Sequence, residues 1–63
     1  MMRAEAKAIY EDGTTGDFFA TGTGPDYRKA LWDLQAYSQD EWRRVEENPA
    51  VAGVDVMVSE VVG

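Results

Sequence analysis

The first quarter of the chain alternates between two kinds of residue. From Arg3 to Glu11 one set of alternate positions holds Ala or Tyr, and the other set is mostly charged. This is the period of a strand with one covered face. The following segment 12–16, Asp-Gly-Thr-Thr-Gly, has the residues that a hairpin turn needs. Residues 17–23 fit the returning strand, so we expect a β-hairpin here.

A helix is expected to follow the hairpin. Pro25 suits the first helical position, and Asp26 faces the positive end of the helix dipole. Pro49 should end the helix near Glu47, because the residue before a proline avoids the α conformation. One broad apolar stripe, interrupted by Ser38 and Glu41, would face the core. The stripe contains Tyr27, Ala30, Leu31, Leu34, Tyr37, Trp42 and Val45.

The length of this helix sets a constraint. About 23 helical residues measure about 34 Å, whereas a strand of eight residues spans about 27 Å. The helix would therefore either kink at Ser38-Gln39 or extend onto another subunit. Beyond it, valines at positions 54, 56 and 58 alternate with Asp, Met and Ser, which predicts a third strand over residues 52–61.

These elements define an α+β fold of order ββαβ, in which one long helix packs on one face of a three-stranded sheet. The single domain covers residues 1–63. The third strand can pair with the first, giving the spatial order 2-1-3, or with the second. We favour 2-1-3, because a central strand of small residues best accommodates a helix that carries large aromatic side chains.

Composition narrows the classes of function. The chain has no Cys and no His, so the common nucleophiles, bases and zinc ligands are missing, and we expect a non-enzymatic protein without cofactor or metal. Twelve acidic and six basic residues give a net charge of −6, which disfavours direct binding to nucleic acid. No apolar run is long enough to cross a membrane, and a cytoplasmic location is expected.

The face of the sheet opposite the helix is the first candidate interaction surface. We expect it to carry apolar residues from all three strands, with one member of the Phe18/Phe19 pair, taken as Phe19. A 63-residue chain has a thin core, which favours a homodimer through this face. The alternative is a half-solvated surface, since Glu5, Lys7 and Asp55 share it. The expected dimer residues are Ile9, Phe19, Met57 and Val61.

Trp32 is the second candidate. It lies about 100° from the centre of the apolar stripe, near Arg28 and Arg43. A Trp beside arginines has the composition of a protein-binding hot spot. The alternative is a ring that lies flat on its own domain under Arg28.

Two features near turns are weaker candidates. Glu11, Asp12 and Asp17 flank the hairpin turn and are either solvated turn residues or part of an acidic surface that meets a basic protein cleft. The Gly22-x-Gly24 segment before the helix could present amides to a phosphate, but without a following Lys and Ser/Thr pair a plain turn is the better interpretation.

Several segments resemble a known family. Residues 9–13 (Ile-Tyr-Glu-Asp-Gly), residues 16–20 (Gly-Asp-Phe-Phe-Ala) and a helix bearing Ala30-Leu31 resemble the HicB-like antitoxin domain over about residues 4–45. This resemblance implies a ββαβ fold and a toxin as partner. In size, acidity and topology the chain is also similar to small phage-encoded inhibitors. We expect a protein-binding module, with an antitoxin domain as the alternative and a carboxylate enzyme as a third hypothesis.

Overall fold

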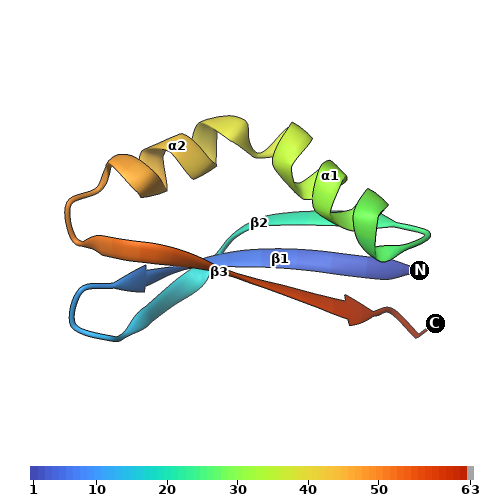
Figure 1. The fold of residues 1–63 in the computed structure, drawn as a ribbon, viewed down its shortest axis with the longest axis horizontal. Coiled ribbons are helices and arrows are strands. Elements are labelled where there is room, and N and C mark those ends of the chain that lie inside the picture. Colours follow the sequence, from blue (N-terminus) through green and yellow to red (C-terminus); the bar gives the residue numbers. More distant parts are fainter. Residues whose placement is uncertain (63) are drawn as a thin grey trace.

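Three antiparallel strands form a sheet, and two helices lie on one of its faces (Figure 1). The computed structural model describes residues 1–62. The fold is therefore α+β, as the sequence predicts. The elements are β1 (Met2–Tyr10), β2 (Thr15–Gly24), α1 (Tyr27–Tyr37), α2 (Gln39–Glu47) and β3 (Val51–Glu60).

The spatial order of the strands is β2-β1-β3, so the predicted order 2-1-3 is confirmed. The central strand β1 turns Ala4, Ala6 and Ala8 toward the helices, and all three are buried. Their small side chains bring the helical layer close to the sheet. Each predicted strand lies within two residues of the observed one.

The hairpin turn between β1 and β2 is held by local hydrogen bonds. The Asp12 carboxylate accepts from the backbone N–H of Thr14 at 3.0 Å and from its hydroxyl at 2.6 Å. Gly13 has a φ of +88°, a conformation that favours glycine because it has no β-carbon. Asp12 therefore acts as a turn residue.

The expected single long helix is wrong: the helix breaks at Ser38, where φ is −128° and ψ is 23°. The Asp26 carboxylate caps the start of α1 by accepting from the Lys29 N–H at 2.9 Å. Ser38 ends α1 and is also the residue from which α2 starts. Of the two alternatives that the helix length left open, the structure has the one at Ser38-Gln39, as a full break that bends the helical layer over the sheet (Figure 1).

Helix α1 rests mainly on β2 and β1, and two glycines of β2 make its close approach possible. A β-carbon at Gly22 would overlap the backbone of Leu34 and lie 2.7 Å from the Ala30 oxygen. A β-carbon at Gly24 would lie 2.8 Å from the Ala30 nitrogen. The Gly-x-Gly segment is therefore a packing surface for α1.

The core is thin. Ala30 and Leu34 of the predicted stripe are buried, and Leu34 is the largest side chain that is fully enclosed. Tyr27 and Tyr37 were expected in the core but are exposed, because Tyr27 starts α1 and Tyr37 ends it. The accessible surface is 4499 Å², whereas a monomeric protein of this mass typically exposes about 4,000 Å².

Candidate functional site

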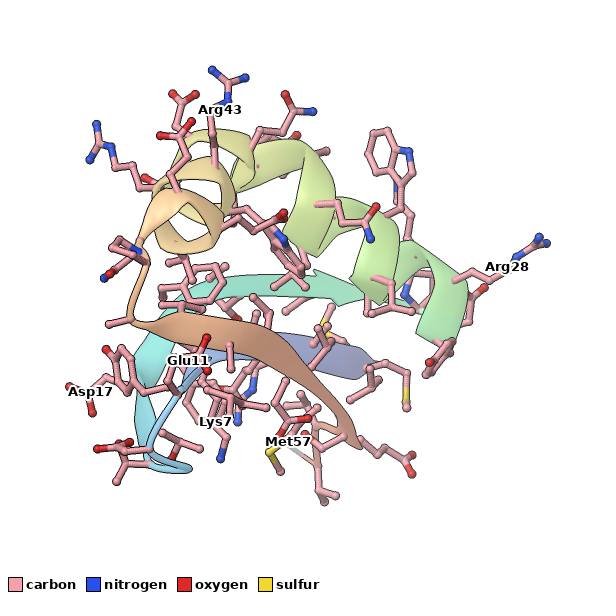
Figure 2. All side chains as sticks on the ribbon, turned by 60° about the vertical axis from the view of Figure 1, so that its left-hand side comes forward. Lys7, Glu11, Asp17, Arg28, Arg43 and Met57 are labelled. Atoms are coloured by element: carbon pink, nitrogen blue, oxygen red, sulfur yellow. The ribbon has the colours of Figure 1, made fainter. Side chains whose placement is uncertain are left out.

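The face of the sheet away from the helices, hereafter the open face, carries the alternate residues of β1 and β3. Ile9 and Met57 lie on it as expected, since the register pairs Ile9 with Gly53 and Met57 with Glu5, whereas Val61 lies just beyond the end of β3. Met57 is 50% exposed. Figure 2 shows Lys7 and Met57 pointing away from the helical layer. Apolar and charged side chains thus share this face.

Phe19 is not on the open face. The register between β1 and β2 shifts after the pair Ala6–Ala20, so that Lys7 faces Phe18 and Phe19 has no partner on β1. This bulge places Phe19 on the same side as Ala20, where its ring meets the Trp42 ring edge-on. The member of the aromatic pair that lies on the open face is Phe18, which is 45% exposed.

Charged residues run along the middle of the open face. The Arg3 Nε lies 3.5 Å from a Glu5 carboxylate oxygen, and the Lys7 ammonium lies 5.6 Å from the centre of the Phe18 ring. Asp55 of β3 is the register partner of Lys7. A second copy packed flat on this face would have to desolvate these groups, which costs free energy that ion pairs seldom recover.

Trp32 lies on the outer side of α1, about 160° around the helix from the buried Leu34. Its side chain is 58% exposed. The Lys29 ammonium lies 4.4 Å from the centre of the indole ring, so a lysine covers the ring where the alternative interpretation has Arg28. A cation at this distance is attracted to the ring face.

The three members of the predicted Trp32 patch are split between two helices. Arg28 precedes Trp32 by one helical turn on α1 and shares its side of the helix. Arg43 belongs to α2, beyond the break at Ser38. Figure 2 shows Arg28 and Arg43 at opposite ends of the helical layer. The local group therefore consists of Trp32 with Arg28 and Lys29, and Lys29 is the member that sequence reasoning missed.

The acidic residues of the hairpin are all exposed. The Glu11 N–H donates to the Ala50 carbonyl at 2.9 Å, which ties the turn to the segment before β3. The Asp12 carboxylate accepts hydrogen bonds from the hydroxyl and the backbone N–H of Thr14. These bonds lower the pKa of Asp12 below its usual value of 3.8, and the hydroxyl contributes most. Within residues 1–62 no group of three acidic side chains is arranged to hold a metal ion.

Broad depressions mark the surface. One, of about 780 Å³, lies along one side of α2 and the neighbouring part of α1. Another lies between the end of α1 and the edge strand β2, and its lining includes Tyr37, Ser38 and Phe18. The larger depression is lined by Gln35, Gln39, Trp42, Arg43, Glu46 and Glu47.

Comparison of the chain with protein-family models, with curated proteins and with solved structures gives no match. The resemblance to HicB-like antitoxin domains therefore stays a prediction. Among the described residues, no helix combines the length and the apolar character needed to cross a membrane.

Proposed function

We propose that this protein is a non-enzymatic binding module that occupies a site on a larger protein, in the manner of a phage or mobile-element inhibitor of a host protein. The observation that carries the proposal is the exposed indole of Trp32. A water-exposed Trp on a helix surface contributes little to the fold, but it gains a large apolar area when a partner covers it. Trp and Arg are also the residues most enriched in binding hot spots.

The surroundings of Trp32 indicate what kind of partner site would fit. Lys29 places a cation over the ring, and Arg28 lies one helical turn before Trp32 on the same side of α1, although the whole chain has a net charge of −6. The complementary site is an apolar slot for the indole with carboxylates at its rim. Acidic side chains elsewhere, including those of the hairpin, would favour basic surface further from the slot and speed the encounter.

The thin core supports the same proposal. Large apolar side chains that stay exposed on a small domain lower its solubility, and a partner that covers them removes this disadvantage. Trp32 and Tyr37 both belong to this class, and they lie about 140° apart around α1. A single partner site is therefore expected to cover one of them, and the neighbouring cations favour Trp32.

The test is affinity capture from a lysate of the host, with the immobilised wild-type protein and two variants as bait. We expect the wild type to retain one defined protein in stoichiometric amount and Trp32→Ala to retain much less of it. Tyr37→Ala is the matched control, because it removes another exposed aromatic ring from the same helix and should capture normally. Absence of a stoichiometric partner, or equal capture by both variants, would contradict the proposal.

A further inference from the structure

The outer edge of β3 carries a row of unpaired backbone groups. The Val61 N–H donates to the Met1 carbonyl at 2.8 Å. Along an antiparallel strand, every second residue is hydrogen-bonded to the neighbouring strand, and this pair sets which residues of β3 bond to β1. The odd-numbered residues therefore bond to β1, and the N–H and C=O groups of the even-numbered residues point outward. No other strand of the described residues pairs with this edge. The outward groups belong to Val54, Val56, Val58 and Glu60.

The other edge of the sheet is protected. Strand β2 has two register shifts opposite Lys7 and its neighbours, and these disturb its regular spacing. The outward N–H of Thr23 donates to the Asp33 carboxylate at 3.0 Å. Bulges and covering groups of this kind prevent edge strands from pairing with other chains. From Gly53 to Glu60, β3 has neither a register shift nor a proline.

The side chains along β3 favour the same contact. Val54, Val56 and Val58 face the helices but are only half-buried, because α1 rests mainly on β2 and β1 and covers little of β3. Valine is also among the residues best suited to a strand. The β3 edge thus combines free hydrogen-bonding groups with uncovered apolar side chains.

We infer that two copies of this chain pair through their β3 edges, antiparallel, to form a continuous six-stranded sheet with all helices on one face. This inference does not depend on the proposed function, since it leaves Trp32 free. A two-fold axis at Val56 would pair Val54 with Val58 of the second copy and form about six main-chain hydrogen bonds. The half-buried valines of both copies then lie side by side.

Charge disfavours the neighbouring register. An axis at Asp55 would set two like carboxylates directly opposite each other, which is destabilising. With the axis at Val56, Asp55 faces Met57 of the second copy and keeps Lys7 as its neighbour on β1. The antiparallel arrangement also holds the two acidic hairpins at opposite ends of the dimer, because the hairpin lies beside the start of β3 (Figure 1).

The test is sedimentation equilibrium of the wild type and of two proline variants. Val56→Pro removes an outward N–H without breaking a bond to β1. Thr21→Pro is the matched control, since by the same alternation the Thr21 N–H points outward from the protected edge of β2. We expect a wild-type dimer, a dissociation constant raised roughly 30-fold or more by Val56→Pro through two lost hydrogen bonds, and no such change for Thr21→Pro. A wild type that stays monomeric at millimolar concentration, or a Val56→Pro variant that dimerises as tightly as the wild type, would overturn the inference.

A cysteine variant decides the matter if Val56→Pro fails to fold. The natural chain has no cysteine, so Val56→Cys introduces a single thiol at the proposed axis. Two such positions would have Cα atoms about 5.5 Å apart, within the range of a disulfide. Mild oxidation should give a covalent dimer of Val56→Cys and none of Thr21→Cys. Equal cross-linking of both variants, or cross-linking of neither, would contradict the β3 contact.

Discussion

The ring of Trp42 stands edge-on to the ring of Phe19, with 5.6 Å between the ring centres and 78° between the planes. This contact joins α2 to β2, at the place where the bulge turns Phe19 toward the helices. Since α2 contains no fully buried residue, the aromatic pair is its principal anchor on the sheet. T-shaped pairs of this kind add to the free energy that burial of the rings supplies.

Phe19→Ala should therefore destabilise the protein much more than Phe18→Ala. We expect the free energy of unfolding to fall by about 2–3 kcal/mol for Phe19→Ala, because it empties a half-buried site beneath α2. For Phe18→Ala the expected loss is below about 1 kcal/mol, since that ring is on the open face. Urea denaturation of both variants at one protein concentration measures the difference. Equal losses would mean that the two rings are placed wrongly.

Gly22→Ala tests the close approach of α1 to β2. A β-carbon at Gly22 meets the backbone of Leu34, and backbone cannot move aside as a flexible side chain can, so we expect a loss of about 2 kcal/mol or more. Gly53→Ala is the control. A β-carbon there has nothing within 4 Å, and removal of a strand glycine should leave stability unchanged or raise it by about 0.5 kcal/mol. Thermal unfolding of both variants would show the contrast, and a harmless Gly22→Ala would refute the packing.

The fold could be predicted from the sequence where one local pattern dominated. The alanines of β1 gave both a strand and a reason for its central place, and Asp26 and Pro49 marked the limits of the helical region. The sequence predicted the break at Ser38 only as one of two alternatives, the other being a helix that extends onto another subunit. A firmer signal was available, since Ser38 followed three residues later by Glu41 is the spacing typical of a helix start.

The candidate sites were harder to predict, because they depend on the register between strands and on the angular position of each residue around its helix. The open face was assigned Phe19, but two register shifts in β2 reverse the sides of the residues between them and place Phe18 there instead, opposite Lys7. Arg43 was grouped with Trp32 by counting about 100° per residue along one continuous helix, whereas the helix breaks at Ser38. The bulge leaves no mark in the alternation of a single sequence, whereas the break coincides with the interruption of the apolar stripe at Ser38 and Glu41.

The hairpin turn should respond to pH through Asp12. Its pKa lies below 3.8 because Thr14 donates to the carboxylate, so the charged form is favoured in the folded protein. The stabilisation is present above the unfolded pKa and is lost as the pH falls through the lower folded value. Thr14→Val removes the hydroxyl donor and should raise the pKa of Asp12 toward 3.8.

Titration of the Asp12 carboxyl carbon by NMR measures this change. Thr15→Val is the control. Thr14 is the only neighbouring residue whose side chain donates a hydrogen bond to the Asp12 carboxylate, so the loss of the Thr15 hydroxyl should not affect it. The Asp12 titration should be the same in Thr15→Val as in the wild type. An unchanged midpoint in Thr14→Val would show that the hydroxyl does not hold the carboxylate.

The proposed binding role of Trp32 is tested most directly by calorimetric titration of the captured partner with purified wild type, Trp32→Ala and Tyr37→Ala. Loss of a central hot-spot residue typically costs at least 2 kcal/mol, so the dissociation constant of Trp32→Ala should rise at least about 30-fold. Tyr37→Ala should stay within about threefold of the wild type. Wild-type affinity in Trp32→Ala, with the fold intact by circular dichroism, would contradict the account.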